Sequence, residues 1–248
     1  MARGRAAKAR PAASPAYGRI GLFSRVGHSG RPGEKHAMAS ARKQAAQRQH
    51  MAQLAARLMA EQGIRDFRIA KQKAAQHLGI DVRNSILPKN SEIEAALAEH
   101  QRLFAGDEQP AQLRAMREAA LQAMALFAEF KPRLVGDVLS GLADAHSDIQ
   151  LHVFAEHSES FDFFLQGQGI PFEIVERRYK VARDAHRFYP AFRFVAGEHR
   201  FEATLFAATE IREAPRSLVD GQPMARATAA QVERLIADEE LEARLAGL

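Results

Sequence analysis

The sequence predicts an α+β fold, in which a helical N-terminal half precedes a small mixed β-sheet with flanking helices. Three observations support this prediction. Between residues 40 and 131, apolar residues recur at the three- and four-residue spacing of amphipathic helices. After Pro132 the spacing changes to the alternation that is typical of strands. With 248 residues, of which 46% are hydrophobic and 26% charged, the chain has enough material to bury a core.

The basic charge of the chain is concentrated in its first segment. Residues 1–37 contain eight Lys or Arg and one acid, whereas 38–248 contain 27 basic and 29 acidic residues. The high pI therefore belongs to a tail rich in Ala, Arg, Gly and Pro, which we expect to be disordered. Three interpretations remain open for this tail: an upstream extension with Met38 as the true start, a basic arm that contacts nucleic acid through counterion release, and a transit peptide.

The helical region, 38–131, is divided at glycines that stand between the periodic segments: Gly63, Gly79 and Gly106. Asp66 is a suitable N-cap for the second helix. Ser91 and Glu94 have the spacing of a capping box at the start of the third. Pro110 suits the first turn of a fourth helix, which we expect to end before Pro132.

The remaining segment, 132–248, is predicted to form an α/β domain. Gly197 is expected to form the turn of a hairpin. A helix is expected over 161–168, and another over 228–245 closes the chain. The alternating segments predict strands at 134–135, 149–154, 172–180, 192–195 and 200–206.

A glycine-containing turn and the strand that follows it carry the strongest functional signal. Val135-Gly136-Asp137 is followed by Gly141, and then by Ser147-Asp148-Ile149-Gln150-Leu151. Because alternate residues of a strand share a face, Asp148, Gln150 and His152 are expected to point away from the core. Glycines in such a turn let the backbone approach a ligand closely.

These residues resemble the motif of the DNA polymerase β-like nucleotidyltransferase superfamily, especially its minimal bacterial members. The family pattern is a hydrophobic residue with Gly-Ser, a second glycine, and then Ser-Asp-hydrophobic-Asp, and both spacings are kept here. The resemblance is close over about twenty residues, looser over 132–206, and does not include the helical half.

The resemblance implies a reaction and a site. In such enzymes paired aspartates hold two Mg²⁺ ions that clamp a nucleoside triphosphate, and a third carboxylate lies on a later strand. Asp148 matches the first aspartate, and Glu202 is the best match for the third. The implied catalytic residues are therefore Asp148, Gln150 and Glu202, with Asp148 and Glu202 as metal ligands. The implied phosphate-binding residues are Gly136, Asp137, Gly141 and Ser147.

Two departures from the pattern bear on activity. Gln150 replaces the second aspartate, and an amide is a weak ligand for a hard cation. Asp137 replaces the serine, which places a negative group where a hydroxyl donor would face the phosphates. Two hypotheses follow. One is transfer of a nucleoside monophosphate from Mg·NTP to an unknown hydroxyl, and the other is a catalytically inactive fold that serves as a binding or regulatory module.

Partners and location follow from the same observations. A nucleotide is the expected ligand, and the helical half is the expected surface for a protein partner or a second copy. The basic segment 177–193 is either a solvated strand edge or the counter-charge for phosphates. The absence of cysteine excludes disulfides, thiolate metal sites and a cysteine nucleophile. With no apolar run long enough to span a membrane, we expect a cytoplasmic protein.

Overall fold

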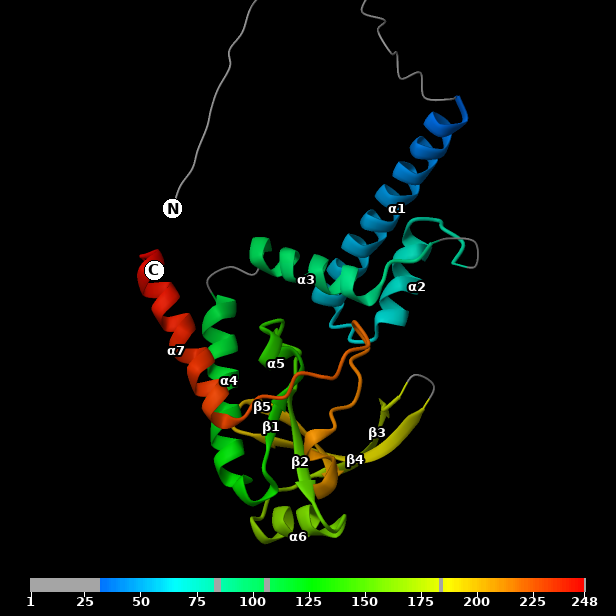
Figure 1. Cartoon of the computed structure of the whole chain (residues 1–248). Helices are drawn as coiled ribbons and strands as arrows, with labels where there is room; N and C mark the ends of the chain where they lie inside the picture. Colours follow the sequence, from blue (N-terminus) through cyan, green and yellow to red (C-terminus); the bar gives the residue numbers. More distant parts are fainter. Residues whose placement is uncertain (1–31, 83–85, 105–107, 183–184, 248) are drawn as a thin grey trace, which may run out of the picture. The chain divides into compact units, whose positions relative to one another are not determined.

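A computed structural model describes residues 32–82, 86–104, 108–182 and 185–247 (Figure 1). The chain divides into two compact units, Met1–Ala41 and Arg42–Leu248. Most of the predicted basic tail, and the predicted break at Gly106, lie outside the described residues. The first helix, α1, begins at Pro32 and therefore inside the predicted tail.

Three helices share one apolar core: α1 (Pro32–Gln62), α2 (Phe67–His77) and α3 (Asn90–Phe104). Met51, Met59 and Ile93 are among its buried residues. Gly63 and Gly79 end the first two helices with φ near +63°, as predicted. The Asp66 side chain caps α2 by accepting hydrogen bonds from the backbone N–H groups of Arg68 and Ile69.

The predicted capping box at the start of α3 is wrong in its residues. The side chain of Glu92, rather than that of Glu94, accepts a hydrogen bond from the backbone N–H of Lys89, at 2.7 Å. The helix therefore begins two residues earlier than the predicted box requires, at Asn90. As a consequence the side chain of Glu94 is free to contribute to a cavity described below.

The fourth helix, α4 (Glu108–Leu126), belongs to the core of the sheet rather than to the core of the first three helices. Its residues Met116 and Met124 are buried there together with Phe127. A short 3-10 turn, η1 (Ala128–Phe130), follows. The physical boundary between the two cores therefore falls between α3 and α4.

The sheet is mixed and has five strands in the order β1-β2-β5-β4-β3. Only β2 and β5 are parallel neighbours, and every other pair is antiparallel. The elements from the first strand onward are β1 (Arg133–Val135), α5 (Gly136–Ser140), β2 (Ile149–Ala155), α6 (Glu159–Gly167), β3 (Glu173–Lys180), β4 (His186–Ala196), β5 (His199–Ala207), η2 (Ala208–Arg212) and α7 (Ala229–Ala246). The predicted α+β architecture is confirmed.

The two faces of the sheet differ in polarity. One face carries Ile149, Leu151 and Val153 of β2, which are fully buried against the core that α4 contributes to. The other face carries Gln150 and His152, together with polar residues of the neighbouring strands. Helices α4 and α7 contact each other (Figure 1). None of the described helices is both long and apolar enough to cross a membrane.

Candidate functional site

The glycine turn is packed directly against the middle of the predicted motif. Gly136 follows β1 and opens α5 with φ +70°, and Gly141 ends α5 with φ +83°. A Cβ atom on Gly136 would lie 2.3 Å from Oε1 of Gln150. A side chain at this position would displace the amide of Gln150, and the positive φ itself favours glycine. The structure brings these two predicted site residues together.

The turn is also held in place from α4. Arg117 is 1% exposed, and its Nε donates a hydrogen bond of 3.0 Å to the carbonyl oxygen of Val138 in α5. The same guanidinium forms an ion pair with Glu239 of α7. A buried arginine that binds helix carbonyls and a carboxylate restricts the movement of α5. Arg117 therefore fixes the position of the turn relative to the two helices.

Gln150 lies directly opposite Glu202 in the parallel pairing of β2 and β5. The next pair along these strands on the same face is His152 and Thr204. Glu202 is 3% exposed, and it is therefore a buried carboxylate on the polar face of the sheet. The structure thus brings together two of the three residues that the sequence predicts as catalytic.

Two arginines hold the carboxylate of Glu202. Nε of Arg177, on β3, donates to Oε1 at 2.6 Å, and Nε of Arg193, on β4, donates to Oε2 at 2.9 Å. Burial alone raises the pKa of Glu202, but the hydrogen bonds and charges of both arginines outweigh it, and the net pKa lies below its ordinary value. The site therefore holds an ionised carboxylate whose counter-charges are built into the sheet.

Asp148 stands just before β2 and pairs with a different arginine. Nε of Arg200 donates to its Oδ1 at 2.7 Å, and Nη2 of Arg200 donates to the carbonyl oxygen of His146 at the same distance. The charge of Asp148 also raises the pKa of Arg177, after the effect of Glu202 on that residue. The charges of both Glu202 and Asp148 therefore act on Arg177. In addition, Asp148 pairs with Arg200, and Glu202 pairs with Arg193.

The remaining polar residues of the turn are bound by Arg65, which precedes α2. Its Nη1 donates to Oδ2 of Asp137 at 3.1 Å, and its Nη2 donates to the hydroxyl of Ser147 at 2.9 Å and to Asp144. Burial raises the pKa of Asp137; the charge of Arg65 opposes this shift, and that of Asp144 adds to it. A residue of the helical region thus binds two of the predicted phosphate-binding residues.

The residues present do not fit a two-metal site. In the described ranges, no three His, Asp or Glu side chains come together where they would hold a metal ion. Asp148 and Glu202, the predicted ligands of Mg²⁺, are each bound to arginine. Gln150, which lies opposite Glu202 on β2, carries a neutral amide. A cation would compete with guanidinium groups that are already in place.

A cavity of about 460 Å³ lies beside the glycine turn. Gly136 and Asp137 line one side, and three basic residues from β3 and the segment after η2 line the other: Arg178, Lys180 and Arg216. Glu94 also lines it. Burial raises the pKa of Glu94, and the charges of Asp137 and Asp220 raise it further. Basic side chains beside a glycine turn favour an anionic ligand.

A buried polar network that the sequence does not predict crosses the same face of the sheet. Nε of Arg226 donates to Nδ1 of His152 at 3.0 Å, and Nε2 of His152 lies 3.3 Å from the hydroxyl of Tyr179. That hydroxyl lies 3.1 Å from the hydroxyl of Thr204. Burial, followed by the charge of Arg226, keeps the pKa of His152 well below its ordinary value. His152 is therefore a neutral, hydrogen-bonded core residue.

Arg65, Asp144, Glu94 and Arg226 are the contributors that sequence reasoning missed. Arg65 and Arg226 stand in segments without any motif, and their partners lie about 70 residues away in the sequence. Glu94 was assigned to a helix cap. The side chain of Asp144 accepts a hydrogen bond of 2.8 Å from the backbone N–H of His146, two residues on, and this Asx-turn is the one signal that the sequence offers.

Comparison with known proteins adds no relative to this description. No protein-family model, curated protein or solved structure matches the chain.

Proposed function

We propose that this chain is a nucleotidyltransferase-like fold that binds a nucleotide without divalent metal and serves as a binding module. The observation that carries the proposal is the environment of Glu202. Its buried carboxylate is held by Arg177 and Arg193 and lies opposite the amide of Gln150. Two-metal transfer needs adjacent carboxylates that are available to cations, and this arrangement supplies guanidinium groups instead.

The energetics favour the arginines over a metal ion. A hydrogen bond to a charged group contributes roughly 1.5–3 kcal/mol, and Glu202 accepts such bonds on both oxygens. Magnesium retains most of its water and is usually held by one or two carboxylates together with substrate phosphates. To ligate it, Glu202 would have to leave both arginines while remaining buried. The fixed positive charge of this face supports binding of an anion directly.

The cavity beside the glycine turn is suited to a phosphorylated ligand. Arg178, Lys180 and Arg216 outnumber its two acids, Glu94 and Asp137. The repulsion expected from Asp137 is reduced because Arg65 pairs with it. Tyr179, Leu218 and Met224 supply an apolar part of the lining, against which a base or sugar can pack. The volume of about 460 Å³ lies within the usual range for small-molecule sites.

Calorimetric titration of the full chain with ATP, GTP, CTP and UTP in EDTA tests this proposal. We expect binding of at least one nucleotide, and a loss of about tenfold or more in the double variant Arg178→Gln/Lys180→Gln, since two phosphate contacts are removed. Arg234→Gln is the matched control, because Arg234 is exposed on α7 and does not line the cavity.

Two results would overturn the proposal. If no nucleotide binds at millimolar concentration, the cavity is not a nucleotide site. If binding needs Mg²⁺ and is lost in Asp148→Asn, the transferase hypothesis takes its place, and a search for the hydroxyl acceptor becomes worthwhile.

A further inference from the structure

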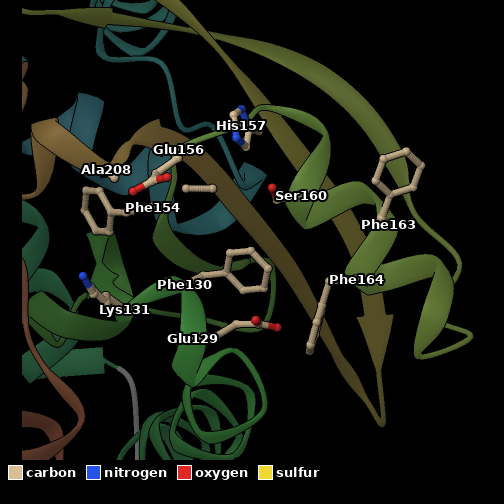
Figure 2. A pocket seen from close by; sticks show the side chains of 11 residues that line it. Glu129, Phe130, Lys131, Phe154, Glu156, His157, Ser160, Phe163, Phe164 and Ala208 are labelled. Atoms are coloured by element: carbon tan, nitrogen blue, oxygen red, sulfur yellow. The ribbon is translucent and has the colours of Figure 1, made fainter.

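A second cavity, of about 550 Å³, lies beside Phe154 and Ala155 at the end of β2, whereas the glycine turn packs against Gln150 near its start. Figure 2 shows the residues that line this second cavity. Its walls come from η1, the last residues of β2, the start of α6 and Ala208 of η2. None of the residues assigned above to the nucleotide site lines it. It is therefore a separate cavity, and an inference about it stands independently of the proposed function.

The floor of this cavity is aromatic. Phe130 is 5% exposed, and the partly buried Phe164 contacts it edge to face, with ring centroids 5.2 Å apart. Phe154 also lines the cavity, but its ring packs against Phe206 and Arg226 on the other face of the sheet. In Figure 2 the ring of Phe130 lies at the centre of the labelled residues, with Glu129 on one side of it and Glu156 and His157 on the other. Such a floor favours a ligand with an apolar or aromatic body.

The rim carries both signs of charge. Glu129 and Glu156 contribute carboxylates, and Lys131 contributes an ammonium group. Within the described residues, no hydrogen bond or ion pair engages any of these three side chains. A ligand with only an amine would be repelled by Lys131, and a ligand with only a carboxylate would be repelled by the two glutamates. A zwitterion satisfies both signs.

The position of Lys131 is fixed by an unusual backbone. Its φ is +48°, and among the described residues it is the only non-glycine with positive φ. Its backbone N–H is bound to the carbonyl oxygen of Ala128 at 3.1 Å, which closes η1. A left-handed lysine costs free energy that glycine or asparagine would largely avoid. The ammonium group of Lys131 thus lies at the rim of the cavity on a strained backbone.

We propose that this cavity binds a free α-amino acid with an apolar side chain. The side chain packs on the rings of Phe130 and Phe164, the ammonium group faces Glu156, and the carboxylate faces Lys131. Ser160, which also lines the cavity, supplies a hydroxyl for hydrogen bonding to the carboxylate.

L-phenylalanine is the probe, and its binding to the full chain is measured by calorimetry or by protein NMR shifts. Two matched ligands each lack one charge: 2-phenylethylamine has no carboxylate, and 3-phenylpropionate has no amine. We expect L-phenylalanine to bind about tenfold more tightly than either. Glu156→Gln should weaken L-phenylalanine and 2-phenylethylamine but not 3-phenylpropionate. Lys131→Asn, which tolerates the left-handed backbone, should weaken L-phenylalanine and 3-phenylpropionate.

The control is Glu233→Gln, an exposed carboxylate of α7 that does not line the cavity, and it should leave all three affinities unchanged. Absence of binding by L-phenylalanine at millimolar concentration would overturn the proposal. Equal affinity for L-phenylalanine and 2-phenylethylamine would overturn it too, because the carboxylate would then not be recognised. A nucleotide titration of the same preparation reports separately on the glycine-turn cavity.

Discussion

Gln150 and Glu202 lie opposite each other on the parallel strands β2 and β5, so that a neutral amide neighbours a buried carboxylate. This pairing explains how Glu202 remains ionised with arginines alone as its partners. An aspartate at position 150 would place two carboxylates side by side, and that arrangement normally requires a metal cation or a shared proton. With an amide at position 150, arginines alone can neutralise the site, whereas a carboxylate there would require a metal cation or a shared proton as well.

Gln150→Asp should convert the site towards metal dependence. We expect this variant to lose about 1–2 kcal/mol of free energy of unfolding, because like charges directly opposite each other on neighbouring strands repel. Added Mg²⁺ should restore part of the loss in this variant and leave the wild type unchanged. Urea unfolding with and without MgCl₂ measures both effects. Gln150→Asn is the matched control, since it has the same length as aspartate without the charge.

Glu202→Gln should destabilise the protein although it removes only one charge. Arg177 and Arg193 would lose their shared partner, and we expect a decrease of roughly 1–3 kcal/mol in the free energy of unfolding. The decrease is no larger because both arginine side chains are about 40% exposed and water screens their charges. Glu173→Gln, at an exposed position opposite Arg193, is the control. Equal effects of the two variants would contradict the role given to Glu202.

The buried His152 makes stability depend on pH. Its folded-state pKa lies well below 6.5, so that in mild acid the unfolded chain binds a proton that the folded chain does not. Stability should therefore fall as the pH drops below about 6.5, by up to about 1.4 kcal/mol per pH unit until the folded pKa is reached. His152→Gln should remove this component of the slope, whatever its effect at neutral pH. Chemical unfolding between pH 7.5 and 5 measures it, and an unchanged slope in the variant would contradict the assignment.

Arg65 should affect nucleotide binding through Asp137. In Arg65→Gln the carboxylate of Asp137 loses its ion pair and faces the phosphates, and we expect affinity to fall several-fold. Adding Asp137→Asn should restore most of it, because the repulsive charge is then absent. Arg68→Gln, an exposed change in α2, serves as the control. A double variant that binds no better than Arg65→Gln would show that Arg65 acts only on the fold of the turn.

Sequence reasoning predicted the elements well where apolar and polar residues alternate along the chain. The strand from Ile149 is one example, because its apolar residues alternate with Gln150 and His152. Strand β4 was predicted over 192–195 and runs over 186–196, since its first residues are mostly exposed and are held by the β3 hairpin rather than by apolar burial. The segment from Gly136 to Gly141 was predicted as a turn, and it forms the short helix α5, which Arg117 holds from α4.

The site was harder to predict than the strands. The sequence indicated that Gln150 and Glu202 belong to one site, and the register of β2 and β5 places them side by side. It did not indicate which cations neutralise the carboxylates, because Arg177 and Arg65 are 25 and 72 residues from their partners, and the pairing of Arg193 with Glu202 depends on the register of the β4–β5 hairpin. A motif specifies the residues of one turn and one strand, whereas the charges that surround them depend on the packing of the whole sheet.

The most direct test of the account is the magnesium dependence of nucleotide affinity in the wild-type protein. Titration of the full chain with the tightest-binding nucleoside triphosphate is carried out once in EDTA and once in excess Mg²⁺. If guanidinium groups take the place of metal, the dissociation constant in EDTA should be equal to or lower than that in Mg²⁺. Binding that appears only when Mg²⁺ is present would contradict the account.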